Sequence, residues 1–499
     1  MPNPLFDELF VKHEGKKDVF LILPDGGSIA YDLFLKRSAQ FANAIKQLGT
    51  QPGDRIAAQV DKSSEALLLY AACVQSGVVF LPLNTAYTVK EISYFLEDSG
   101  ASIFVSNTAR ASAVASVCDD LQVQQTTLNA DGSGTLSELA STQPDRFETV
   151  DCEESDLVAL LYTSGTTGRS KGAMLTHKNL LSNAKLLAKY WQFSASDSLL
   201  HALPIFHVHG LFVATNVTLV AGGTMIFLPK FDLDQMIGFF PNATTMMGVP
   251  TFYTRLLDDP RFTKDLTSSM RLFISGSAPL LVETHTEFEE RTGHRILERY
   301  GMTETNMNTS NPYNGDRRAG TVGMPLPGIE VKITDASTGD TVSQGEIGQI
   351  EVRGPNVFKG YWNMPEKTAA ELREDGFFIT GDLGKIDSDG YLHLVGRDKD
   401  LIISGGYNIY PKEIELILDA QQSVKESAVI GVPHADFGES VVALIVPEAE
   451  SSPNVEELSS LCQGSLAGFK CPRQFIIVEE LPRNAMGKVQ KKVLREIYG

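Results

Sequence analysis

The sequence predicts an α/β fold: a large N-terminal region of layered α/β sheets, a β-barrel-like subdomain and a small α+β unit at the C-terminus. Three observations predict it. Strand and helix patterns alternate from Arg55, short strands follow one another after about Gly320, and a compact mixed unit begins near Arg397. Alternation is typical of a parallel sheet covered by helices, whereas consecutive short strands between Gly and Asp turns are typical of antiparallel sheets.

The first α/β set runs from residue 55 to residue 106. The strand patterns "RIAAQV", "VVFLPL" and "SIFVSN" alternate with the helical patterns "SSEALLLYAACVQSG" and "TVKEISYFLEDSG". In the second helix, Thr88 and Glu91 have the spacing of a capping box, four apolar residues share one face, and Gly100 follows the last turn. This order predicts a parallel sheet.

A polar connection, residues 129–156, separates this set from a second one. The second set contains the apolar runs "SLLHALPIF", "GTMIFLP", "TTMMGVP" and "RLFISGS" between helical patterns. The longest apolar stretch, residues 212–229, is interrupted by an asparagine, three threonines and two glycines. It is too polar for a membrane span, and we interpret it as buried strand and turn.

The C-terminal third changes in character. "GIEVKITD", "GEIGQIEVRG" and "GYLHLVGR" predict an antiparallel or barrel-like subdomain. Beyond Arg397, "DLIISGGYNIY" predicts strand and turn, "PKEIELILDA" a helix, and "ESAVIGV" and "SVVALIVPE" strands, before a helical end. The sequence therefore predicts a domain boundary at residues 397–399.

The length, charge and cysteine content of the chain exclude some classes of function. The chain has 499 residues, enough for two or more domains, and a net charge of −19, which argues against non-specific binding to nucleic acid or to anionic membranes. The N-terminus lacks the pattern of a secretory or transit peptide, and the five scattered cysteines are interpreted as reduced thiols. We expect a cytoplasmic protein that must build local positive sites if its ligands are anions.

The segment "YTSGTTGRSKGAM", residues 162–174, concentrates hydroxyls and glycines around Arg169 and Lys171. It fails the Walker template, because Ser170 and Gly172 stand where that template needs Gly and Ser or Thr. A strand pattern, "KGAMLT", follows the loop, and the next helix begins later with Thr176 as its cap. The segment is therefore a hairpin-like loop. It can surround a polyphosphate or be a flexible polar turn, and by itself it leaves both open.

Four further motifs follow in order: "ERYGMTETN", "FFITGDLG", "HLVGRDKDLIISGGYNIYPKEIE" and "PRNAMGKVQ". With the loop, they resemble the acyl-adenylate-forming superfamily of acyl-CoA synthetases, adenylation domains and luciferases, over nearly the whole chain. "HALPIFHVHGLFVATNVTL", "MGVPTFYTRLL" and "LFISGSAPLL" resemble the malonyl-CoA synthetases of that superfamily. The resemblance implies an ATP-dependent malonate:CoA ligase. Malonate, ATP and CoA would give malonyl-CoA, AMP and diphosphate through a malonyl-adenylate, with methylmalonate as a second substrate.

The resemblance also implies a division of labour along the chain. Residues 1–396 would form the adenylation domain, residues 397–399 a hinge centred on Asp398, and residues 400–499 a mobile domain that carries the catalytic Lys488. ATP and the acid would bind in the cleft between the two domains.

The superfamily pattern assigns roles to individual residues. Lys488, Thr303 and Glu304 would be catalytic: Lys488 would bridge the carboxylate and the α-phosphate, and Glu304 would coordinate Mg²⁺. Tyr300 would stack on adenine, and Asp382 would accept hydrogen bonds from the ribose. The implied ATP-binding set is Thr163, Ser164, Gly165, Thr166, Thr167, Gly168, Lys171, Gly276, Ser277, Ala278, Glu298, Tyr300, Gly301, Met302, Thr303, Asp382, Arg397 and Lys488.

For the acid, we predict that Arg255 clamps the second carboxylate of malonate, because a guanidinium can donate two parallel hydrogen bonds. His207 and Ser277 would complete the pocket, and Met302 and Met307 would limit bulk at the α-carbon. From the residues alone, a helix-surface salt bridge of Arg255 with Asp258 or Asp259 is favoured over the clamp, and a core histidine is favoured for His207; the resemblance reverses that order.

The CoA tunnel is predicted at Ser404, Gly405 and Gly406, where an ordinary hairpin turn is the alternative. Acetylation of Lys488 by a lysine acetyltransferase would remove its charge and is a hypothesis about regulation. The other functions considered are a P-loop kinase or ATPase, a CoA ligase for another small, aryl or fatty acid, a carrier-protein adenylation domain, a luciferase-type oxygenase and a non-catalytic nucleotide-binding protein.

Overall fold

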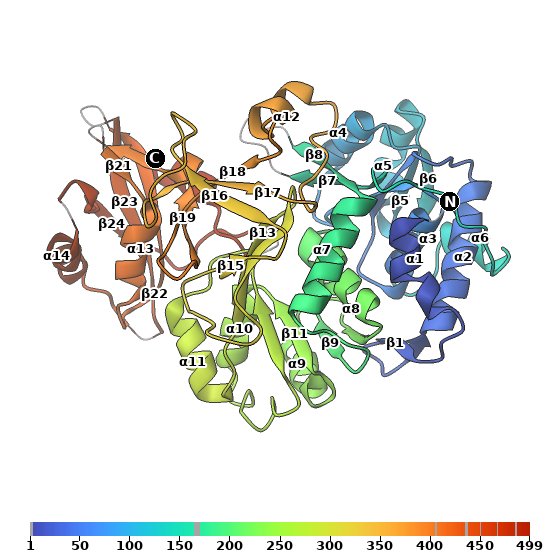
Figure 1. Cartoon of the computed structure of the whole chain (residues 1–499), viewed down its shortest axis with the longest axis horizontal. Coiled ribbons are helices and arrows are strands. Elements are labelled where there is room, and N and C mark those ends of the chain that lie inside the picture. The colour runs from blue at the N-terminus through green and yellow to red at the C-terminus, as the bar shows by residue number, and fades with distance from the viewer. Residues whose placement is uncertain are drawn as a thin grey trace.

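The computed structural model describes residues 3–163, 170–404, 407–434, 438–449, 451–466, 468–484 and 487–499. Figure 1 shows a large N-terminal part, blue to orange, and a smaller C-terminal lobe, dark orange to red, at one end of the molecule. The large part contains two sheets covered by helices and a third, antiparallel sheet next to the lobe.

The first sheet has six strands in the order β6-β5-β3-β4-β7-β8. The five strands from β6 to β7 are parallel, and β8 is antiparallel to β7. The strands are β3 (Arg55–Gln59), β4 (Val79–Pro82), β5 (Ile103–Ser106), β6 (Gln124–Thr127), β7 (Leu157–Thr163) and β8 (Lys171–Thr176), and the helices between them are α3 (Ser64–Gln75), α4 (Val89–Ser99), α5 (Thr108–Asp120) and α6 (Thr135–Ser141).

This sheet confirms the predicted strand and helix order. The capping box at the start of α4 is present in both directions, between Thr88 and Glu91, and Gly100 ends the helix in the left-handed conformation. The polar connection, residues 129–156, differs from the expectation in one respect, because it contains the short helix α6. Buried Leu136 and Ala140 give this helix an apolar side that packs on α2 (Tyr31–Gln47).

The second sheet has nine strands in the order β15-β14-β13-β12-β11-β9-β10-β1-β2. Its six central strands are parallel, and β2, β14 and β15 add antiparallel edges. The strands are β1 (Val19–Ile22), β2 (Ser28–Ala30), β9 (Ser198–His201), β10 (Thr224–Phe227), β11 (Thr245–Gly248), β12 (Leu272–Ser275), β13 (Leu297–Met302), β14 (Asn306–Ser310) and β15 (Met324–Pro325). The associated helices are α1 (Pro4–Leu9), η1 (Val11–His13), α7 (His177–Tyr190), α9 (Leu233–Phe239), η3 (Phe240–Asn242), α10 (Pro250–Leu257) and α11 (Val282–Thr292).

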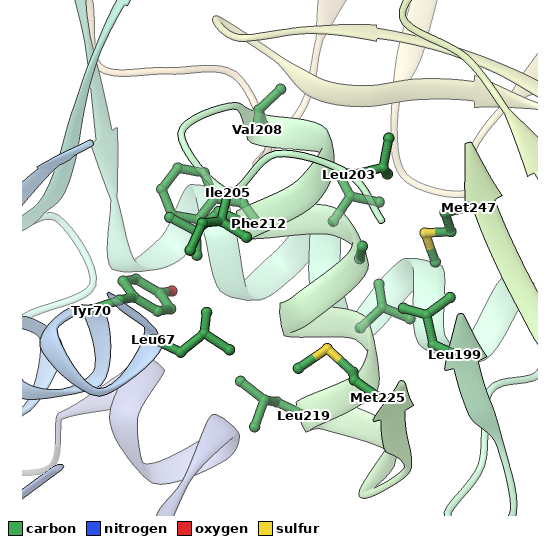
Figure 2. Packing of buried hydrophobic residues seen from close by; sticks show 14 of the residues in the cluster. Leu67, Tyr70, Leu199, Leu203, Ile205, Val208, Phe212, Leu219, Met225 and Met247 are labelled. Carbon is green, nitrogen blue, oxygen red and sulfur yellow. The ribbon is translucent and has the colours of Figure 1, made fainter. Parts of the chain in front are cut away.

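The interpretation of residues 212–229 as strand and turn was wrong for its first half. The chain forms a π-helix, η2 (His209–Thr215), and then α8 (Asn216–Ala221) before β10. Residues 209–219 are all buried, so their apolar pattern has no period that separates helix from strand. Figure 2 shows the reason for the burial: Phe212 and Leu219 pack in a cluster with Leu67 of α3 and Met225 of β10. This cluster joins the six-stranded sheet and its helices to the nine-stranded sheet.

The third sheet is antiparallel, as predicted, with the order β16-β17-β18-β19. Its strands are β16 (Glu330–Thr334), β17 (Gly348–Arg353), β18 (Phe378–Ile386) and β19 (Leu392–Arg397), and α12 (Pro365–Glu371) lies between β17 and β18 in the sequence. The last residue of β19, Arg397, is followed directly by the short helix η4 (Asp398–Asp400), where the chain enters the lobe.

The C-terminal lobe has its own sheet and its own two hydrophobic clusters. The elements are β20 (Ile402–Ser404), β21 (Tyr407–Ile409), α13 (Pro411–Asp419), β22 (Val424–His434), β23 (Gly438–Pro447), α14 (Val455–Ser465), η5 (Gly468–Lys470), β24 (Gln474–Ile477) and α15 (Lys491–Tyr498). Helix α13 packs against β19, so the lobe contacts the antiparallel sheet. None of the helices in the described part of the chain is long and apolar enough to cross a bilayer.

Candidate active site

The loop motif lies between two antiparallel strands, as predicted. Thr163, at the end of β7, pairs with Lys171, at the start of β8, and Thr176 caps α7. The loop residues predicted to bind phosphate lie outside the described residues: Ser164, Gly165, Thr166, Thr167 and Gly168. The residues that flank the loop in the sequence, Thr163 and Lys171, are described, and both lie close to the turn after β13.

Those ends meet Glu304 and Tyr361. The Thr163 hydroxyl donates to Glu304 Oε1 at 3.3 Å, and the Tyr361 hydroxyl lies 3.1 Å from the same oxygen. The Lys171 ammonium donates to the Tyr361 hydroxyl at 3.0 Å and lies 3.4 Å from Glu371. Lys171 is 9% exposed and Glu304 4% exposed, so this group of charges is largely removed from water.

Glu304 has the character expected of a metal ligand. Burial raises the pKa of its carboxyl, and Lys171 and Tyr361 oppose that rise only in part. A divalent cation would restore the charged form, because carboxylate oxygen is a preferred ligand of Mg²⁺. The residues present therefore fit a magnesium ion held by Glu304 together with phosphate oxygens.

A second group of predicted residues meets where β13 faces β18. The Tyr300 hydroxyl donates to Asp382 Oδ2 at 2.6 Å, and Arg397 Nε lies 2.8 Å from Asp382 Oδ1. Asp382 and Arg397 are cross-strand partners in β18 and β19, which fixes their distance. Glu298, two residues before Tyr300, is buried and faces His285 at 3.7 Å.

Lys488 belongs to the lobe but lies beside residues of the large part. Burial lowers the pKa of its ammonium to about 8, and the nearby Arg397 guanidinium lowers it further, while Asp382 raises it. The preceding residue, Gly487, has φ +72°, and a Cβ there would stand 3.1 Å from the Thr251 hydroxyl of α10. The lobe is therefore docked with its lysine segment against α10.

The acid end of the site forms where β12 and β13 finish. Ser277, just beyond β12, has a left-handed backbone with φ 73°, uncommon for a serine, and its hydroxyl lies 3.1 Å from His209 Nδ1. His209 begins the π-helix η2, and such π segments are frequent at functional sites. Gly276 is required at its position, because a Cβ there would collide with the Arg299 guanidinium.

Arg299 is the unusual residue of this pocket. It is 3% exposed, and among the described residues its Nε and Nη2 atoms have no hydrogen-bond partner. Burial lowers its pKa to about 9. Burial, Arg299 and Lys488 together lower the pKa of His207 to about 4, so that imidazole is neutral near pH 7. A buried guanidinium without a counterion is costly, and an anionic ligand would compensate it.

The remaining predicted residues fall into two groups. Thr303 is buried, and Gly301, Met302 and Met307 lie around the turn after β13. Ala278 follows Ser277 beyond β12, Ser404 is buried at the end of β20, and Gly405 and Gly406 lie outside the described residues.

Arg255 is exposed on α10, with its guanidinium 5.8 Å from the Phe231 ring centroid. Asp259, considered as its partner, pairs with Arg261 instead. Arg255 follows Thr251 by one helical turn, so it lies on the side of α10 that faces the docked lysine segment. The described contacts do not link it with Arg299.

Sequence reasoning missed four residues of the site: Arg299, His209, Tyr361 and Glu371. Arg299 stands inside "ERYGMTETN", and two adjacent charged residues, Glu298 and Arg299, in the buried strand β13 were a usable signal. His209 follows His207 in "FHVHG". Tyr361 and Glu371 are outside every quoted motif, and the sequence carries no signal that they approach Lys171.

Comparison with known proteins agrees with this geometry. Residues 9–362 match the AMP-binding enzyme family, and residues 413–488 match the AMP-binding enzyme C-terminal domain. The chain therefore belongs to the AMP-binding enzymes, the superfamily of acyl-CoA synthetases.

Individual relatives indicate which kind of AMP-binding enzyme the chain is similar to. The chain is 35% identical to malonate–CoA ligase of Arabidopsis thaliana over 98% of this chain and 86% of the relative. It is 36% identical to feruloyl-CoA synthase of an Amycolatopsis species over 95% of each. Among solved structures, ATP-bound MatB from Rhodopseudomonas palustris is 55% identical, with a TM-score of 0.98 over 100% of this chain and 99% of that one. The apo form of MatB, 54% identical with the same coverage, gives a TM-score of 0.87.

The protein is an AMP-forming acid–CoA ligase close to the malonyl-CoA synthetases, and its substrates include ATP and CoA. The whole-chain TM-score is higher for the ATP-bound form of MatB than for the apo form.

Proposed function

We propose that the chain is a malonate–CoA ligase that works through a malonyl-adenylate. Two reactions would occur in one site. A carboxylate oxygen of malonate attacks the α-phosphorus of ATP and diphosphate leaves; the CoA thiol then attacks the acyl carbon and AMP leaves. Both reactants of the first step are anions, so the site must neutralise charge before they can meet.

The observation that carries the choice of acid is Arg299. This buried guanidinium has two nitrogen atoms, Nε and Nη2, without a hydrogen-bond partner in the described part of the chain, and it lies beside Gly276 at the acid end of the site. A monocarboxylic acid uses its one carboxylate in the reaction and would leave Arg299 without a partner. Malonate brings a second carboxylate, which can accept two hydrogen bonds from one guanidinium. Ser277 and His209 supply further polar contacts, and neutral His207 adds no competing charge.

The nucleotide end would be built from the two groups described above. Thr163 and Lys171 would hold the phosphates that leave as diphosphate, and Asp382 would receive the ribose hydroxyls. Glu304 would hold a magnesium ion, which neutralises phosphate charge. These roles remain proposals, as do Tyr300 as the adenine platform and the wall at Ser404 for the pantetheine arm of CoA.

Lys488 would supply the positive charge between carboxylate and α-phosphate. Because it is carried by the lobe, we propose that the lobe rotates about Asp398, at the start of η4, after adenylation. That rotation would withdraw the lysine and admit CoA. Acetylation of Lys488, methylmalonate as a second substrate and a cytoplasmic location stay predictions from the sequence.

The test is diphosphate release across a panel of acids, with and without CoA. Malonate is expected to give AMP and diphosphate at a kcat/KM at least 100-fold above acetate, propionate and ferulate, as expected for a site whose buried charge needs a partner. Succinate measures the tolerance for length. A preference for ferulate or for a fatty acid would refute the choice of malonate and leave the ligase class intact.

A further inference from the structure

Glu371 is a charged residue of the site that no recognised motif contains. It is the last residue of α12, and its carboxylate is bound on three sides. Oε2 accepts from the Tyr361 hydroxyl at 2.7 Å and lies 3.4 Å from the Lys171 ammonium, while Oε1 lies 2.6 Å from Lys367. The side chain is 20% exposed, so water competes weakly for these contacts.

The position of Glu371 relative to Lys171 is fixed by the backbone. Residues 359–362 run beside β8, where Lys359 and Trp362 donate to the carbonyls of Met174 and Gly172. Tyr361 forms a bridge with Ala173, and its N–H donates to the Thr368 hydroxyl of α12 at 2.9 Å. The segment that carries Tyr361 therefore ties α12 to the strand that begins with Lys171.

The charges in this cluster favour an ionised Glu371. Burial would raise its pKa, but Lys367, Tyr361 and Lys171 outweigh burial and hold the pKa below its usual value. Lys171 thus faces an ionised carboxylate in the structure. In the sequence it directly follows the segment predicted to bind phosphate. The Glu371 carboxylate therefore lies within contact distance of Lys171, the cation that a phosphate would contact in the proposed function.

We propose that Glu371 is a positioning residue that holds Lys171 between turnovers and competes with the departing diphosphate for it. The inference rests on the role of Lys171 in the proposed function. It goes further, because it proposes that Glu371 lowers the affinity of the enzyme for the product diphosphate. A loop that binds the phosphates of ATP tightly must also release diphosphate, and an internal carboxylate lowers the affinity for both.

The consequence is specific to ligands that carry phosphates beyond the α-position. Removing the charge of Glu371 frees Lys171 for diphosphate and removes a repulsive anion, so diphosphate should bind more tightly. AMP lacks those phosphates and should bind as before. A purely structural role for Glu371 would weaken both ligands together or neither.

The experiment measures binding of magnesium diphosphate and of AMP to the full chain by titration calorimetry, without acid or CoA. Glu371→Gln is expected to bind diphosphate about fivefold to tenfold more tightly and AMP unchanged. Glu371→Asp keeps the charge but withdraws it by one methylene, and should fall between wild type and Glu371→Gln. Glu366→Gln removes the same charge from an exposed position on the same helix and should match wild type.

Equal or weaker diphosphate binding by Glu371→Gln overturns the inference. If that variant does not fold, the order of Glu371→Asp and wild type decides in its place, because only competition predicts tighter binding by the aspartate. The result is independent of malonate. Failure of the wild type to bind diphosphate would instead refute the role of Lys171 and with it this inference, whereas a malonate failure would appear only in the acid panel.

Discussion

Arg299 and Lys488 are two cations at one site, held in opposite ways. Arg299 lies on β13, inside the nine-stranded sheet, and is 3% exposed. Lys488 lies on the segment between β24 and α15, half-buried, and reaches the site only because the lobe is docked against α10. Burial lowers the pKa of both, to about 9 and about 8.

This difference in location suits two different roles in the proposed function: Arg299 would recognise the acid, and Lys488 would activate its carboxylate. A guanidinium fixed by a sheet is present in every lobe position. In the proposed function it would therefore hold the free carboxylate of malonate before adenylation and that of the malonyl-adenylate afterwards. A lysine on a separate lobe acts only while that lobe is docked. The comparison predicts that changes at Arg299 alter which acid is used, and that changes around Lys488 alter one half-reaction.

The largest effect is expected for Lys488→Ala. It removes the charge between two anions, and adenylation should fall by about 1,000-fold, the upper range for loss of one electrostatic contact. Thiolysis of supplied malonyl-adenylate should keep most of its rate. Both half-reactions can be followed by AMP and malonyl-CoA formation, with Lys492→Ala, exposed on α15, as the control. Equal loss in both would remove the distinction between the two cations.

Arg299→Leu is expected to lower kcat/KM for malonate by about 100-fold, roughly 3 kcal/mol for a lost charged contact. The activity with propionate should hold or rise, because no buried cation remains without a partner. Arg255→Leu is the matched comparison. Since Arg255 is exposed, we expect less than a fivefold effect. A larger malonate defect in Arg255→Leu than in Arg299→Leu would support the prediction from the sequence that Arg255 is the clamp.

The pH dependence sharpens the comparison. Lys488 is charged below its pKa of about 8 and neutral above it. The kcat/KM of adenylation should therefore fall about tenfold per pH unit above about pH 8, since that parameter reports the free enzyme. The thiolysis step should lack this limb. Lys488→Arg should move the limb to higher pH, and an unchanged limb in that variant would assign the titration to another group.

The smallest effect is expected for Gly487→Ala. Its φ of +72° and the nearby Thr251 hydroxyl make a side chain unfavourable in the docked state. A cost of about 1–2 kcal/mol would slow adenylation about tenfold and leave thiolysis unaffected. Thr251→Ala together with Gly487→Ala should recover part of the rate, because it removes the hydroxyl and the methyl group that a Cβ at position 487 would meet. Equal slowing of both steps would indicate a general loss of stability, which thermal unfolding would detect.

Much of the architecture could be predicted from local patterns. The strands and helices of the first sheet, the capping box at Thr88, the hairpin between Thr163 and Lys171 and the antiparallel sheet after residue 320 all have signals within a few residues. The π-helix η2 could not be predicted in this way, because an entirely buried segment has no amphipathic period. Its conformation depends on the side chains of α3 and β10 that pack around it.

The candidate site, like the fold, could be predicted from local patterns only in part. The motifs identified the residue types that meet ATP and located most of them, since each motif is a loop or strand end with its own chemistry. They did not single out Arg299, whose Nε and Nη2 atoms have no hydrogen-bond partner among the described residues. The motifs do not show that Arg299 is buried and Arg255 exposed.

The sequence by itself determined the order of elements, the class of ligase and the residues available for phosphate and carboxylate chemistry. Tertiary structure alone decided that Arg299 is buried with no hydrogen-bond partner for its Nε and Nη2 atoms among the described residues. It also decided that Glu371 lies beside Lys171, 200 positions away in the chain. The physical reason is that solvation and charge pairing depend on what surrounds a group in space. Those surroundings come from segments that are distant in the chain, and the local sequence of a segment does not show which other segments will pack beside it.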